Sequence, residues 1–127
     1  MARVLGIGGV FFKSKDPGAL AGWYRDVLGL ELEDWGGIVF RPGAMAAHPG
    51  AATVFSPFEA DTTYFAPSTR EFMINLAVDD LDAMLASCAA HGVDATVLPD
   101  ETNGRFAHVL DPDGTKIELW QPAPTPD

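Results

Sequence analysis

Apolar residues predict a strand followed by a helix near the start of the chain. Residues 4–13 are rich in Val, Ile and Phe, which is typical of a β-strand. Asp16 is a good N-cap, and Pro17 suits the first helical position because that position needs no N–H donor. Apolar residues then recur at helical spacing up to Leu28, and Gly29 predicts a left-handed end to the helix.

Short strands and one long connection are expected to complete the first half. We predict three strands at residues 30–34, 38–41 and 51–56. Gly36-Gly37 predicts a hairpin turn between the first two, and residues 42–50 are expected to form a loop. Residues 59–70 form a long polar and aromatic connection. The first half therefore reads as a strand, a helix and three further strands.

The second half repeats this order. Residues 72–78 alternate between the two faces of a strand, and Asp79 or Asp80 caps a helix that Gly92 ends. Three more strands are expected at residues 93–98, 104–110 and 115–121. The last two are joined by the turn Asp111-Pro112-Asp113-Gly114, and the three prolines of residues 122–127 predict a frayed tail.

The two halves indicate an internal duplication. Leu28-Gly29 and His91-Gly92 end the two helices and are separated by about half of the 127 residues. We therefore expect one domain over residues 1–127. Module one spans about 4–58, and module two spans about 72–121.

Charge and cysteine content narrow the functional classes. Eighteen Asp and Glu against eight Lys and Arg give a formal net charge of −10, which argues against nucleic acid and anionic membrane partners. Cys88 is the single cysteine, so neither an internal disulfide nor a cysteine-rich zinc site can form. We read residues 4–13 as a strand rather than a signal peptide, and we expect the protein in the reducing cytoplasm.

Four stretches of the chain carry a resemblance to a known family. They are Gly8–Phe12 with Asp16-Pro17, Trp23–Leu30, Phe72–Asp82, and Gly104–Phe106 with the Asp111–Gly114 turn and Glu118-Leu119-Trp120. Together they resemble the vicinal-oxygen-chelate superfamily, which contains glyoxalase I, bleomycin resistance proteins and extradiol dioxygenases. The chain is most similar to the bacterial glyoxalase-related branch.

This resemblance implies an α+β fold. Two tandem βαβββ modules would form a curved, cup-like mixed sheet with helices on the convex face and a ligand in the concave face. In the superfamily a divalent metal often lies in that cup. The resemblance, together with the small size of the chain, also implies a homodimer.

Most metal-ligand positions of the superfamily lack a ligand here. Gly9 and Met73 occupy two of them, and residues 51–56 contain no His, Asp or Glu. Only Glu118 matches. We therefore expect no metal site and no cofactor, with a divalent metal held by atypical ligands as the alternative.

Side-chain parity gives candidate site residues independently of the family. In the last strand, Ile117 and Leu119 share one face, while Glu118 lies on the other face beside Met73 and Asn75. Glu118 is the candidate general base or hydrogen-bond acceptor, with a raised pKa if it is buried among apolar groups. The alternative is a structural carboxylate.

Other residues could complete this site. His108 is a candidate acid or base, and the alternative is a hydrogen-bonded strand histidine. Candidate ligand contacts are Met73, Asn75, Phe11, Tyr64, Arg105 and Trp120. Tyr64, Phe65 and Arg70 would form a lid over the cup, or pack the crossover or a subunit contact.

The leading hypothesis is a small-molecule-binding, glyoxalase-like protein with a degenerate metal site and an unassigned reaction. Whether it is an enzyme stays open at this point. The first alternative is a metal-dependent lyase or dioxygenase that uses Glu118, His108 and a group from a partner subunit. The second is a binder that sequesters a drug without reaction, as bleomycin resistance proteins do.

Overall fold

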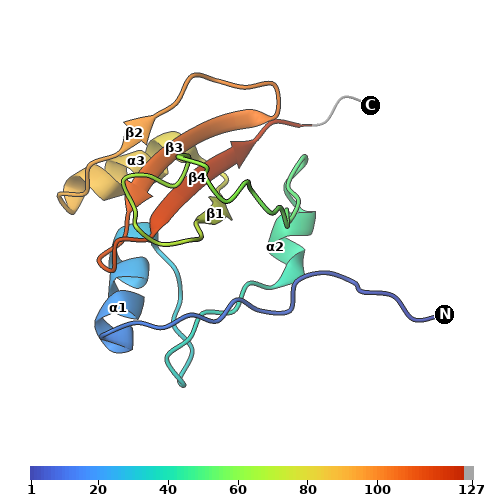
Figure 1. Ribbon diagram of the computed structural model, residues 1–127, viewed down its shortest axis with the longest axis horizontal. Coiled ribbons are helices and arrows are strands. Elements are labelled where there is room, and N and C mark those ends of the chain that lie inside the picture. The colour runs from blue at the N-terminus through green and yellow to red at the C-terminus, as the bar shows by residue number, and fades with distance from the viewer. Residues whose placement is uncertain (125–127) are drawn as a thin grey trace.

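The second half of the chain forms a four-stranded mixed sheet. The computed structural model describes residues 1–124, in which the strand order is β1-β4-β3-β2. The strands are β1 (Ile74–Ala77), β2 (Thr96–Val97), β3 (Gly104–Leu110) and β4 (Lys116–Pro122). β1 pairs with β4 in parallel, and the other two pairings are antiparallel (Figure 1). The α+β class is confirmed, and module two has the predicted βαβββ order with helix α3 (Leu81–Ala90) after β1.

Both long helices begin at the predicted caps. Asp16 accepts a hydrogen bond from the backbone N–H of Ala19 at 3.1 Å and begins α1 (Pro17–Leu28). Asp80 accepts one from Ala83 at 3.0 Å and begins α3. These aspartates satisfy amide groups that the first helical turn leaves unpaired.

The hydrophobic core lies between the two helices and one face of the sheet. α1 packs beside α3, and α3 contacts β3 and β4 (Figure 1). The core combines side chains of both helices with those that β3 and β4 direct toward them: Leu20, Tyr24, Val27, Leu28, Leu81, Cys88, Ala107, Val109, Ile117 and Leu119. Within residues 1–124, α1 and α3 thus lie on one face of the sheet, and neither of them covers the other face.

The four strands predicted for module one are not formed. Residues 4–13, 30–34, 38–41 and 51–56 run as chain without strand pairing, and the expected loop contains helix α2 (Pro42–Ala46). The turn between the second and third segments does form, with Glu33 and Gly37 bonded at 2.8 Å. Strand propensity is local, whereas a strand also needs a neighbour to accept its hydrogen bonds. Consequently the sheet of the described chain comes from module two alone.

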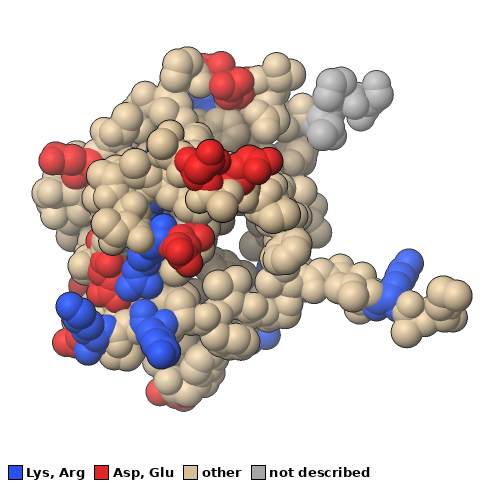
Figure 2. All heavy atoms as spheres, viewed as in Figure 1, with Lys and Arg blue, Asp and Glu red and all other residues tan. Residues whose placement is uncertain are grey.

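The first module leaves large apolar side chains in solvent. Phe11 is 94% exposed and Phe55 is 87% exposed. In the space-filling view the N-terminal end extends away from the body, and acidic side chains lie at several separate places on the visible face (Figure 2). Among residues 1–124, no helix is long and apolar enough to cross a membrane. Of the predicted frayed tail, Pro122 ends β4 instead and the backbone N–H of Ala123 donates to the Asn103 carbonyl oxygen at 3.1 Å, so this part of the prediction is wrong. Residues 125–127 lie outside the described chain.

A buried hydrogen bond ties α1 to the turn between β3 and β4. The hydroxyl of Tyr24 donates to Asp111 Oδ2 at 2.7 Å, and Asp111 Oδ1 accepts from the backbone of Asp113 and Thr115 at 3.0 and 2.9 Å. Burial, reinforced by the bond to Asp111, raises the pKa of Tyr24 far above its usual range. The phenol therefore stays a hydrogen-bond donor at every physiological pH.

We predict that Tyr24→Phe lowers the free energy of unfolding by about 1.5–3 kcal/mol, because a buried carboxylate loses a donor. Urea denaturation at pH 7 measures this loss. Asp111→Ala, which also releases the turn, should cost more. An unchanged urea midpoint for Tyr24→Phe would contradict the structural role assigned to this bond.

Candidate functional site

Polar side chains converge on the sheet face that carries no helix. Asn75 of β1 lies opposite Glu118 of β4, and Glu118 lies opposite His108 of β3. The register thus places three polar residues in one row across three adjacent strands. A fourth residue, Tyr64, reaches this row from the connection 59–70, which crosses over the strands in Figure 1.

Glu118 is the centre of this arrangement. Its Oε2 accepts hydrogen bonds from the Tyr64 hydroxyl at 2.5 Å and from His108 Nε2 at 2.7 Å. Its Oε1 accepts one from Asn75 Nδ2 at 2.9 Å, and the Tyr64 hydroxyl lies 3.3 Å from His108 Nε2. We call these four residues the Glu118 cluster.

The electrostatics of the cluster correct one expectation. Burial by itself raises the pKa of Glu118, but the hydrogen bonds from Tyr64, His108 and Asn75 outweigh it and leave the pKa below its usual value. The raised pKa expected for a Glu118 buried among apolar groups does not arise, because three hydrogen-bond donors surround the carboxylate. Glu118 is therefore an ionised carboxylate, and as an acceptor it requires the proton on Nε2 of His108.

Tyr64 is the matching donor. Desolvation, with the hydrogen bond to Glu118, raises the pKa of Tyr64 above its usual range. The phenol thus keeps its proton while Glu118 keeps its charge. A carboxylate with a lowered pKa and three donors is a strong hydrogen-bond acceptor and a weak base.

Lys116 is a member of the site that the candidate set omitted. Its Nζ donates to the backbone carbonyl oxygens of Tyr64 at 2.6 Å and Ala66 at 3.0 Å, and lies 4.9 Å from the centre of the Tyr64 ring. Burial lowers the pKa of Lys116. The signal was in the parity of β4, because Lys116 is two residues from Glu118 and shares its face.

Aromatic residues surround Tyr64. The ring of Phe58 stacks on it with centroids 5.8 Å apart, and the ring of His108 meets it edge-on at 5.5 Å. Phe65 packs against Phe58 at 5.3 Å. Tyr64 of the connection, with Phe58 stacked on its ring, therefore covers Glu118, which is only 9% exposed.

Other candidates lie outside the cluster. Arg105 projects to the helix side, where it pairs with Asp82 at 2.9 Å and Asp100 at 3.7 Å. Phe11 is exposed in the unpaired N-terminal segment. Along β3, Arg105 has the same parity as Ala107 and Val109, which are buried in the core beside the helices, so its position on the helix side follows from strand alternation.

The remaining candidates lie nearer to the open face. Trp120 follows Glu118 on that face, stacks on Phe106 at 6.2 Å and donates from Nε1 to the Asn103 carbonyl oxygen at 3.0 Å. Met73 is half-buried just before β1. Arg70 Nη2 lies 3.7 Å from Asp113 Oδ2, so it links the end of the connection 59–70 to the turn between β3 and β4.

The donor set does not fit a catalytic metal. His108 Nε2 and Glu118 Oε2 are bonded to each other, and the remaining partners are a protonated phenol and an amide. Within residues 1–124, no three His, Cys, Asp or Glu side chains are grouped so that they could hold a metal ion. Catalytic zinc usually has three protein ligands, so no step through a metal is derived for this site.

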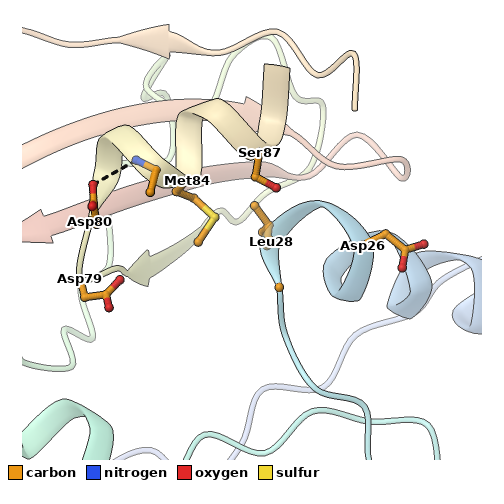
Figure 3. A pocket seen from close by; sticks show the side chains of 8 residues that line it. Asp26, Leu28, Asp79, Asp80, Met84 and Ser87 are labelled. Carbon is orange, nitrogen blue, oxygen red and sulfur yellow. Dashed lines mark hydrogen bonds between the residues drawn. The ribbon is translucent and has the colours of Figure 1, made fainter. Parts of the chain in front are cut away.

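A separate hollow lies on the helix side. It has a volume of about 250 Å³ between the end of α1 and the start of α3, and Leu28 and Met84 contribute its apolar wall (Figure 3). Asp26, Asp79 and Asp80 lie around it, and Asp80 is already engaged as the cap of α3. This hollow does not contain any residue of the Glu118 cluster.

Comparison with known proteins adds a domain match. A family model described as a glyoxalase-like domain matches residues 9–120. No curated protein matches the sequence significantly.

Solved structures show partial likeness. One is a glyoxalase/bleomycin resistance protein from Streptomyces sp. CB03234, with 35% identity, a TM-score of 0.36, and coverage of 39% of this chain and 45% of that one. The antibiotic-binding protein TnmS3 from the same Streptomyces has 24% identity, a TM-score of 0.49, and coverage of 82% and 84%. A putative glyoxalase family protein from Bacillus anthracis has 19% identity, a TM-score of 0.39, and coverage of 49% and 50%. Each of these TM-scores is below 0.5, so the assignment of the chain to a family depends on the domain match over residues 9–120.

We predict that Glu118 makes stability depend on acid pH. Its folded-state pKa is below the ordinary value of about 4.5, so its stabilising contribution is complete above that pH and is lost as pH falls through the folded-state pKa. The difference in unfolding free energy between wild type and Glu118→Gln should therefore be largest near pH 7 and shrink in acid. Urea denaturation across this range measures it. Glu59→Gln, at an exposed position, is the control, and a difference independent of pH would contradict the prediction.

Proposed function

Because the chain belongs to the glyoxalase-like domain family, we propose that it binds a small organic molecule at the Glu118 cluster without a resident metal. The observation that carries this proposal is the ionised carboxylate of Glu118, held by three donors on the sheet face that no helix covers. A buried charge with a perturbed pKa is more common at functional sites than in ordinary cores. The connection 59–70 is the lid of this site.

The chemistry of the cluster supports binding more strongly than proton abstraction. A ligand O–H or N–H group could replace one of the present donors to Glu118, and aromatic side chains nearby would bury its apolar part. If the protein turns its ligand over, Glu118 would accept the proton and His108 would donate one. The reaction itself is left unassigned.

A metal-dependent lyase or dioxygenase is the second candidate. The adjacent positions of His108 and Glu118 on neighbouring strands favour it, since imidazole and carboxylate are both zinc ligands. This function would need at least one more ligand, for which a partner subunit is the available source. Sequestration of a drug without reaction is compatible with the first proposal and with the net charge of −10.

The protein is further proposed to act as a homodimer in the cytoplasm. The unpaired segments of module one carry strand-forming residues with exposed apolar side chains, and a second copy would give them partners. A reducing compartment suits Cys88, which is buried and free.

We predict that ligand binding depends on Glu118 and not on metal. Compounds from a screen that raise the melting temperature of the wild type should bind Glu118→Gln about tenfold or more weakly, because a charged acceptor is lost. Their affinity for the wild type should be unaffected by a chelator. Calorimetry on the hits measures both effects, with Glu59→Gln as the matched control. Binding that ignores Glu118→Gln would refute the proposed site, and binding abolished by the chelator would favour the metal-dependent candidate.

We also predict a dimer mass in solution by light scattering. Replacing the exposed Phe11 and Phe55 with aspartate should shift the mass to that of a monomer, because charge in a buried strand interface opposes association. Lys15→Asp, at an exposed position outside these segments, is the control and should leave the mass unchanged. A monomeric wild type at micromolar concentration would disprove the dimer.

A further inference from the structure

The Tyr64 side chain lies against the other residues of the Glu118 cluster in the way that a bound phenol would. Its hydroxyl donates to Glu118, its ring stacks on Phe58 with an interplanar angle of 29°, and His108 meets the ring edge-on. The ammonium group of Lys116 lies 4.9 Å from the ring centre, within the range of a cation–π contact. Together, the groups around the Tyr64 side chain offer an acceptor for one hydroxyl, an apolar face and a cation. We call this surrounding the phenol slot.

The backbone that carries Tyr64 is anchored separately from its side chain. Lys116 bonds to the carbonyl oxygens of Tyr64 and Ala66, and neither bond involves the Tyr64 ring. Tyr64 itself is 39% exposed, so its side chain lies at the solvent edge of the slot. The ring can therefore leave the slot while Lys116 keeps the connection in place.

The charges of the slot select among possible occupants. An anionic ligand would be repelled by the carboxylate of Glu118, and a cationic ligand would be repelled by Lys116. An uncharged aromatic ring with one hydroxyl suits both Glu118 and Lys116. The hydroxyl can donate a hydrogen bond to Glu118, and the electron-rich face of the ring can make a cation–π contact with Lys116.

We propose that Tyr64 is an internal occupant of the phenol slot and that the ligand carries a hydroxyl on a flat aromatic ring, which displaces the Tyr64 side chain on binding. This inference rests on the proposed function and names the chemical class of its ligand. Because the ligand must compete with Tyr64, the apparent affinity of the wild type is lower than that of a chain whose slot is empty.

The test empties the slot and refills it with a probe. In Tyr64→Ala, p-cresol, which has the shape of the missing side chain, should bind at least about tenfold more tightly than in the wild type. Toluene, which lacks the hydroxyl, should bind this variant about tenfold or more weakly than p-cresol. Adding Glu118→Gln to Tyr64→Ala should reduce that preference. Calorimetry gives the affinities, and circular dichroism verifies the fold of each variant.

Equal binding of p-cresol by wild type and Tyr64→Ala, or equal binding of p-cresol and toluene by the variant, would overturn the proposal. If Tyr64→Ala does not fold, Tyr64→Phe replaces it, because phenylalanine fills the slot without the bond to Glu118. That variant should bind p-cresol more tightly than the wild type, and an equal affinity would overturn the proposal as well. The proposed function fails on a different result, namely screened ligands that ignore Glu118→Gln.

Discussion

The alternation of side chains along β4 is the constraint on which the rest of this structure depends. Ile117 and Leu119 are fully buried against the helices, and this burial orients the strand. Successive residues of a strand point to opposite faces, so Lys116 and Glu118 must lie on the open face. A shift of one residue would bury both charges under the helices, which the desolvation of unpaired charge forbids.

The open face is in turn organised by charge. Glu118 collects donors from β1, β3 and the connection, while Lys116 holds the backbone of that same connection. Each ionised group is thereby hydrogen-bonded although it is buried, which is the condition under which buried charge is tolerated. The connection between the modules consequently belongs to the site as well as to the fold.

Reasoning from the sequence predicted which side chains share a strand face better than it predicted their interactions. Parity placed Glu118 beside Asn75 on one face, and the register of β1 and β4 pairs these two residues. The pKa of Glu118 is lowered, not raised as burial among apolar groups would make it, because the direction of the shift depends on how many donors arrive from other segments. The parity of β4 places Lys116 on the same face, but its partners are backbone carbonyl groups 52 and 50 residues away, and a local pattern does not reveal those bonds.

Local patterns also account for the helices, their caps and the strand-rich second half. The resemblance of four stretches to the superfamily is borne out by the glyoxalase-like domain match over residues 9–120. Local patterns indicated strands in module one with equal clarity, and there the tertiary structure decided otherwise. Composition and periodicity measure how readily a segment becomes extended, whereas a sheet forms only where two segments meet in register and exchange hydrogen bonds. In module two β1, β3 and β4 meet in this way, and in module one the strand-forming segments meet no partner within the described chain.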